Sequence, residues 1–204
     1  MYSLYDFARC QRPDGTYYGT KGKCRKGVQV GAKQKEYKVG VTWGKFNIPT
    51  PGHARVIKSL LEKSERVDVI MSGAKTNVDW HLRNLMFRRV LKQQGVDTSR
   101  VRFVHARNTF EALKGIIDEQ GAKNVVLALG EDRQSYLEGL MKKFGIGGQL
   151  IPRPEGSESS TMMRGLIDRG ELEKLRKIYG DDEYIVKLAR IVRMEEKARE
   201  AAEK

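Results

Sequence analysis

Gly44-Lys45-Phe46-Asn47-Ile48-Pro49-Thr50-Pro51-Gly52-His53 joins an apolar run to an amphipathic pattern. The run before it, 37–43, is rich in β-branched and aromatic residues, which is typical of a buried strand. Thr50 suits the N-cap of a helix, and Pro51 then falls at the first helical position, where its missing N–H costs nothing. We therefore expect a strand, a short loop and a helix over 51–64.

The loop between these elements has the chemistry of an anion site. A helix N-terminus carries unpaired backbone N–H groups and the positive end of the helix dipole. Gly52 and His53 fall in the first turn, so we expect free backbone N–H groups beside an imidazole. The alternative is a capped helix in which His53 only packs.

Outward from this loop, short apolar runs alternate with helical patterns. Candidate strands lie at 37–43, 67–72, 101–106, 124–129 and 149–152, and candidate helices at 51–64, 79–94, 108–120 and 133–144. This alternation predicts an α/β fold: a Rossmann-like open parallel sheet of about five strands with flanking helices. Such a sheet binds its ligand at the carboxyl ends of its strands.

The two ends of the chain differ from this middle part. Residues 1–36 form an irregular, basic arm rich in Gly and Tyr, and helical patterns at 160–169, 171–179 and 183–203 make the C-terminal part wholly helical. We expect three parts: the arm 1–36, an α/β domain 37–170 and C-terminal helices 171–204.

The charge of the chain favours anionic partners. Lys and Arg number 39 against 26 Asp and Glu, giving a net charge of +13. This balance is typical of proteins that bind nucleic acid, nucleotides or other phosphates. Aromatic and basic residues interleave in the arm, so it could stack bases, join a neighbouring subunit or a larger assembly, or form a poorly ordered tail.

Several classes of protein are disfavoured. No apolar run is long enough to cross a bilayer, and the N-terminus lacks a signal-peptide pattern, so we expect a cytoplasmic protein without a membrane partner. Cys10, Cys24, His81 and His105 lack zinc-ligand spacing, and we expect no dedicated metal ligand. Neither a P-loop nor a G-x-G-x-x-G pattern is present.

The loop resembles a known family. Gly-x-Phe-x-x-Pro-Thr-x-Gly-His, at 44–53, looks like the first signature of the nucleotidyltransferase superfamily with the HxGH or TxGH motif. The resemblance is closest to phage-encoded nucleotidyltransferases, which would imply the host cytoplasm. Ile48 stands where that group has the first of two prolines, and Thr50 stands where many relatives have His.

Three further segments extend the resemblance. Ser159-Ser160-Thr161-Met162-Met163-Arg164 is similar to the Ser-Ser-Thr-x-x-Arg element that opens a late helix in this family. Gly130-Glu131-Asp132-Arg133 resembles the Gly-Ser-Asp-Arg that ends the fourth strand, with Glu131 replacing Ser. The loop at 73–77 matches a position where relatives bind the acceptor phosphate.

The resemblance implies transfer of a nucleoside monophosphate from an NTP to a small phosphorylated acceptor, with release of pyrophosphate. ATP is favoured over CTP, and Mg²⁺ would arrive with the triphosphate. The implied catalytic residues are His53, Thr50 and Lys45. The implied nucleotide-binding residues are Gly44, Phe46, Gly52, His53, Gly130, Asp132, Arg133, Ser159, Ser160, Thr161 and Arg164, and the implied acceptor-binding residues are Lys75, Arg83 and Arg88.

Individual roles follow from the resemblance. His53 would bind the α-phosphate, and Thr50 a phosphate oxygen. Lys45 and Lys75 would offset charge on donor and acceptor, and Ser160, Thr161 and Arg164 would hold the β- and γ-phosphates.

A second hypothesis belongs to a different class. The basic arm, with the departures at Ile48 and Glu131, also fits a binding or structural protein that keeps the fold. Such a protein would dock into a larger, phage-type assembly, form a homo-oligomer through the arm, or bind nucleic acid.

Overall fold

The computed structural model describes residues 35–73, 76, 78–152 and 158–202, together with β1 (Cys10–Gln11) and β2 (Tyr17–Tyr18). The chain divides into two compact units, 1–35 and 36–204. In the first unit β1 and β2 pair antiparallel, so the segment expected to be irregular contains this short ladder. Cys24 and most of the arm, with its expected partner contacts, fall outside the described residues.

The second unit is built on a sheet of five parallel strands. These are β3 (Tyr37–Gly44), β4 (Ser64–Ser72), β5 (Val101–Ala106), β6 (Val125–Gly130) and β7 (Gly147–Ile151), in the order β5-β4-β3-β6-β7. The predicted Rossmann-like fold is confirmed. After β3 the chain builds the sheet first through β4 and β5, and then returns to the other side of β3 for β6 and β7. The loop after β3 therefore lies at the switch point, where ligands of such sheets bind.

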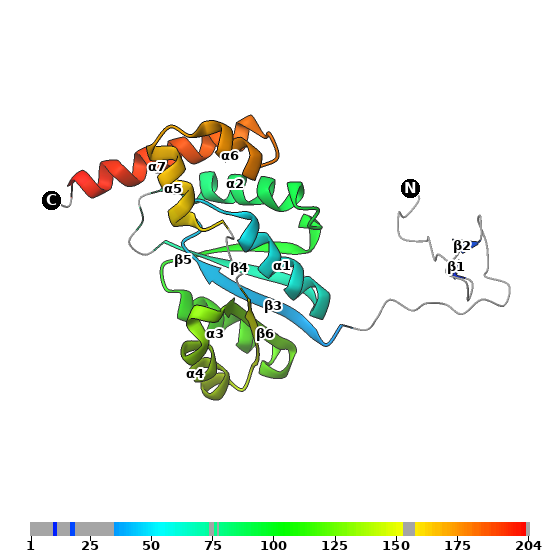
Figure 1. The fold of residues 1–204 in the computed structure, drawn as a ribbon. Helices are drawn as coiled ribbons and strands as arrows, with labels where there is room; N and C mark the ends of the chain where they lie inside the picture. Colours follow the sequence, from blue (N-terminus) through cyan, green and yellow to red (C-terminus); the bar gives the residue numbers. More distant parts are fainter. Residues whose placement is uncertain are drawn as a thin grey trace, which may run out of the picture. The chain divides into compact units, whose positions relative to one another are not determined.

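Helices cover both faces of this sheet (Figure 1). α1 (Pro51–Lys63) and α2 (Trp80–Gln93) pack on one face, and α3 (Thr109–Gln120) and α4 (Gln134–Phe144) pack on the other. The two faces follow from the alternation along each strand, because successive side chains point to opposite sides. On β4, Val69 packs with the α1 and α2 side chains, whereas Ile70 packs with those of α3 and α4.

The C-terminal part is helical, as expected. α5 (Ser160–Asp168), α6 (Leu172–Ile178) and α7 (Glu183–Ala202) pack with α2 around a separate cluster of buried side chains (Figure 1). Ile48, from the loop after β3, is fully buried in this cluster and so anchors the loop to the C-terminal helices. Of the helices that the structure describes, none has the length and apolar character needed to cross a membrane.

One boundary differs clearly from the expectation. β4 begins at Ser64, three residues before the apolar run at 67–72 that predicted it. α1 ends at Lys63, one residue before the end of the expected helix over 51–64. The Ser64 hydroxyl donates to the carbonyl oxygen of Leu60 at 2.7 Å, and Tyr37 of β3 lies opposite Ser64. Backbone pairing therefore extends the strand over polar residues, which a hydrophobicity pattern does not detect.

Candidate functional site

The loop after β3 turns sharply into α1. Phe46 has a φ of +47°, in the left-handed region that residues other than glycine rarely adopt. Its ring is buried and packs against His53 and Phe87, with ring centroids 5.1 and 4.9 Å apart. Thr50 is the N-cap of α1 and Pro51 is its first residue, as predicted. Aromatic packing beneath the loop thus holds a backbone conformation of the kind that clusters at functional sites.

His53 is held in one orientation by the backbone of Thr50. The Thr50 N–H donates to Nδ1 of the imidazole at 3.0 Å, and the Thr50 hydroxyl oxygen lies 3.2 Å from the same nitrogen. Because a backbone N–H can only donate, Nδ1 accepts and the ring proton lies on Nε2. The imidazole therefore presents an N–H donor on its far side.

The expectation of free backbone N–H groups is wrong for His53. Its N–H donates to the carbonyl oxygen of Thr50 at 3.0 Å, which closes the first turn of α1. The contribution of His53 to an anion site would come from its ring rather than from its amide.

The second signature element opens α5 as predicted. Ser159 is the N-cap, and its hydroxyl accepts from the N–H of Met162 at 3.0 Å. The Ser160 hydroxyl, expected to face phosphate, donates to the carbonyl oxygen of Ile48 at 3.0 Å. This bond joins the two signature elements, which lie 112 residues apart in the sequence.

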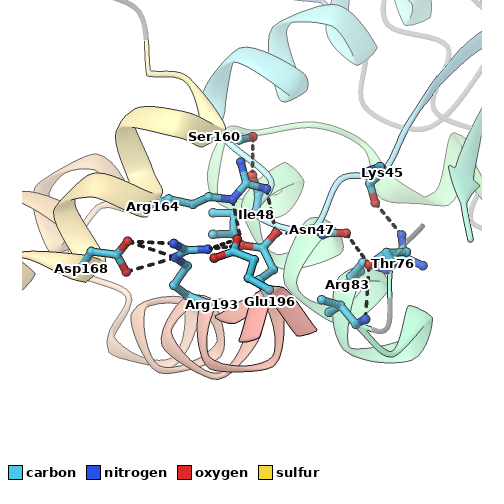
Figure 2. A network of polar contacts seen from close by, with 12 residues as sticks. Lys45, Asn47, Ile48, Thr76, Arg83, Ser160, Arg164, Asp168, Arg193 and Glu196 are labelled. Carbon is cyan, nitrogen blue, oxygen red and sulfur yellow. Dashed lines mark hydrogen bonds and ion pairs between the residues drawn. The ribbon is translucent and has the colours of Figure 1, made fainter. Parts of the chain in front are cut away.

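Arg164 lies one turn into α5 and is paired with α7. Its guanidinium donates to both carboxylate oxygens of Glu196, from Nε at 2.8 Å and from Nη2 at 2.7 Å (Figure 2). Asn47 of the loop after β3 donates to the same carboxylate at 2.8 Å. Burial raises the pKa of Glu196, but the hydrogen bonds from Arg164 and Asn47 outweigh it and leave the pKa below its ordinary value.

The structure brings the predicted catalytic and nucleotide-binding residues together around one cavity of about 440 Å³. All of them line it: Gly44, Lys45, Phe46, Thr50, Gly52, His53, Gly130, Asp132, Arg133, Ser159, Ser160, Thr161 and Arg164. Four of the lining side chains are cationic and two are carboxylates: Lys45, Arg55, Arg133 and Arg164, and Asp132 and Glu158. An excess of cations in a concave site favours an anionic ligand.

Two of the predicted acceptor residues, Arg83 and Arg88, lie away from the cavity. Lys75 lies outside the described residues. Arg83 is buried, with 1% of its surface exposed, and donates to the carbonyl oxygens of Lys45 and Ser72 at 2.5 and 2.9 Å. Arg88 is exposed, bonds Asn84 on its own helix and covers the ring of Phe103. Neither arginine lines the cavity, because one supports the loop from below and the other faces outward.

Sequence reasoning missed several lining residues. Arg55 follows His53 by two residues, and its guanidinium lies 3.9 Å from the carboxylate of Glu158 on the segment before α5. Trp43 also lines the cavity and packs edge-on against Tyr136, with ring centroids 5.8 Å apart. Arg55 and Trp43 lie within two residues of the segment 44–53, so extending the motif by a few residues on each side would have included them. Glu196, which pairs with Arg164 but does not itself line the cavity, had no local signal in the sequence.

An aromatic group lies at the carboxyl ends of the neighbouring strands. The indole of Trp80, at the start of α2, stacks on the imidazole of His105 at the end of β5, with centroids 5.4 Å apart. The His81 ring lies 4.2 Å from the same indole. The backbone joins these strand ends through the N–H of Gly73, which donates to the carbonyl oxygen of Ala106 at 2.8 Å.

A scan against protein-family models and a search of curated proteins returned no match. Solved structures do match. Nicotinic acid mononucleotide adenylyltransferase of Plasmodium falciparum, in complex with NaAD, is 17% identical with a TM-score of 0.52, over 68% of this chain and 89% of that one. A protein of Vibrio parahaemolyticus assigned as a nicotinate-nucleotide adenylyltransferase is 18% identical with a TM-score of 0.53, over 76% and 96%.

A third structure is the bifunctional NMN adenylyltransferase/ADP-ribose pyrophosphatase of Francisella tularensis. It is 17% identical with a TM-score of 0.53, over 66% of this chain and 43% of that one. Another structure of this enzyme is complexed with AMP and a manganese ion. At these identities the likeness concerns the fold, and the chain has the fold of the nucleotide adenylyltransferases.

Proposed function

We propose that the chain is a nucleotidyltransferase that transfers a nucleoside monophosphate, with ATP the favoured donor, to a small phosphorylated acceptor. The observation that carries this proposal is the cavity at the switch point, which His53 lines together with four cationic side chains. The adenylyltransferase fold of the solved structures supports it.

The reaction asks little covalent chemistry of the protein. An oxygen of the acceptor phosphate attacks the α-phosphorus of the NTP in line, and the bond to the β-phosphate's bridging oxygen breaks as pyrophosphate leaves. His53 would donate from Nε2 to the α-phosphate, where negative charge shifts toward the leaving group. Lys45 would offset charge on the donor, and Thr50 would keep the imidazole in its productive tautomer.

The triphosphate would lie toward α5. Thr161 and Arg164 line the cavity there, while the hydroxyl of Ser160 is committed to the carbonyl of Ile48. We assign Thr161 and Arg164 to the β- and γ-phosphates, and Ser160 to holding the two elements together. Mg²⁺ would be carried by the triphosphate, which needs few protein ligands for this ion.

The nucleoside of the NTP and the acceptor phosphate have separate candidate positions. Gly130, Asp132 and Arg133 line the cavity at the end of β6 and would contact the nucleoside. The acceptor phosphate would lie near the loop at 73–77, where Lys75 remains a candidate. Arg83 would act only through the backbone that it supports.

A pyrophosphate-release screen tests this function. ATP, CTP, GTP and UTP would each be combined with Mg²⁺ and a panel of phosphomonoesters, using the full chain. We expect release that needs both substrates and falls at least about 10²-fold in His53→Ala, the loss that follows removal of one such donor. His81→Ala, which removes an exposed imidazole outside the cavity, is the matched control. Release that survives His53→Ala unchanged would refute the role of His53, and no release with any pair would refute the function.

A further inference from the structure

We propose that Glu196 is a positioning residue, which orients Arg164 and Asn47 for the triphosphate in the cavity. The inference rests on the proposed function, because it concerns the same site. It assigns a role to a residue of the last helix, 149 positions from Asn47 in the sequence.

Both oxygens of the Glu196 carboxylate accept from the side chains that it orients. Oε1 accepts from Asn47 at 2.8 Å and from Nη2 of Arg164 at 2.7 Å, while Oε2 accepts from Nε of Arg164 at 2.8 Å (Figure 2). Only 10% of the Glu196 side chain is exposed. Charge-assisted bonds in a fork are short and directional, so they restrict the rotamers of both donors.

This arrangement decides which edge of Arg164 faces the cavity. Nε and Nη2 are turned toward Glu196, and Nη1 has no hydrogen-bond partner among the residues that the structure describes. The side chain is 31% exposed and lines the cavity. Arg164 can therefore offer Nη1 to a phosphate oxygen without first breaking its pair with Glu196.

Arg193 also contacts the carboxylate of Glu196 and helps to fix its position. Arg193 binds both oxygens of Asp168 on α5, with bonds from Nε at 3.0 Å and from Nη2 at 2.9 Å, and its Nη1 lies 3.5 Å from Oε2 of Glu196. Arg193 is only 12% exposed. Two arginines thus flank one carboxylate, which keeps Glu196 ionised and fixed in place.

Asn47 links Glu196 to the loop that follows β4. Asn47, which donates to Glu196, also accepts from the hydroxyl of Thr76 at 3.3 Å, beyond the end of β4 (Figure 2). Glu196 therefore contacts the loop after β3 and helix α5 directly, and Asn47 extends this network to the loop after β4. A residue that only stabilised the packing of α7 would not need to engage two side chains at a cavity.

The test compares Glu196→Gln with Glu200→Gln in the full chain. Glutamine keeps the shape but places an NH₂ group against the donors of Arg164, so the fork is lost. Glu200 also pairs with Arg193, at 3.0 Å, but is 60% exposed and touches neither Arg164 nor Asn47. The readout is the affinity for ATP with Mg²⁺, measured by calorimetry. Thermal melting confirms that each variant folds.

We expect Glu196→Gln to weaken ATP binding about tenfold, as for the loss of one charge-assisted bond. Glu200→Gln should stay within about twofold of the original protein. In an Arg164→Ala background Glu196→Gln should have a clearly smaller effect on affinity, because only the part that acts through Asn47 remains.

Two results would overturn this inference and leave the proposed function standing. One is ATP affinity that is unchanged in folded Glu196→Gln while the original protein binds normally. The other is tighter binding, which would mean that Glu196 competes with phosphate for Arg164. Failure of the original protein to bind any of the four triphosphates would overturn the proposed function as well.

Discussion

The guanidinium of Arg83 donates to the carbonyl oxygen of Lys45 at 2.5 Å, from beneath the loop that carries the first signature. The same nitrogen donates to the carbonyl oxygen of Ser72 at 2.9 Å, so one buried cation ties the ends of β3 and β4 together. Burial lowers the pKa of Arg83, and the nearby charge of Asp79 offsets this effect in part. The shape of the loop depends on this residue of α2.

Replacing Arg83 should destabilise the fold. Arg83→Met would leave the carbonyl oxygens of Lys45 and Ser72 without their buried partner, at a cost of about 3 kcal/mol in the free energy of unfolding. Urea denaturation measures this loss. Arg88→Met, on the exposed side of the same helix, should cost less than about 1 kcal/mol. Equal losses in the two variants would contradict the supporting role of Arg83.

Tyr179 links the C-terminal helices to the same loop. Its hydroxyl donates to the carbonyl oxygen of Pro49 at 2.7 Å, and the side chain is fully buried. Tyr179→Phe should lower the free energy of unfolding by about 1–2 kcal/mol, because the Pro49 carbonyl loses its donor. Tyr184→Phe, with 42% of the residue exposed, should change it by less than about 0.5 kcal/mol.

Burial also raises the pKa of Tyr179. In an absorbance titration the Tyr179→Phe protein should therefore lose no phenolate signal below about pH 11, where exposed tyrosines ionise. A loss of signal in that range would show that the phenol is open to solvent.

Gly40 lets β3 approach α1 closely. A Cβ added there would lie 2.8 Å from the Ser64 hydroxyl oxygen and 3.0 Å from Leu60, whereas one added at Gly139 of α4 would meet nothing within 4 Å. Gly40→Ala should cost about 1–3 kcal/mol through overpacking. Gly139→Ala should stabilise the protein by about 0.5–1 kcal/mol through helix propensity. Denaturant midpoints that move in the same direction would contradict this contrast.

Asp168 makes the free energy of unfolding depend on pH in the acidic range. Hydrogen bonds from Arg193 and Lys197 lower its pKa from 3.8 to about 2. A depressed pKa contributes stability that is complete above about pH 4 and is lost as the pH falls toward 2. Asp168→Asn should thus be less stable by about 1 kcal/mol at pH 6, since the pair is partly exposed. This difference should vanish near pH 2; a constant difference would show that the carboxylate charge is not the cause.

Much of the fold could be predicted because its signals are local. Apolar runs and helical periodicity located the five strands and seven helices of residues 37–202, mostly to within a residue or two. Thr50 was recognised as an N-cap, since capping depends on a few consecutive residues. The residues expected to meet in one site came from the resemblance of the motifs to a known family, and the residues of the two main motifs line one cavity.

Local pattern could not supply the contacts that only folding creates. The sequence by itself determined the elements, their caps and the loop of 44–53 at the switch point. The tertiary structure decided that Arg83 lies under the loop, that Ser160 bonds Ile48, and that Glu196 reaches Asn47 across 149 residues. The reason is physical: secondary structure follows from interactions a few residues apart, whereas a buried charge takes whichever partner the packing of distant helices brings to it.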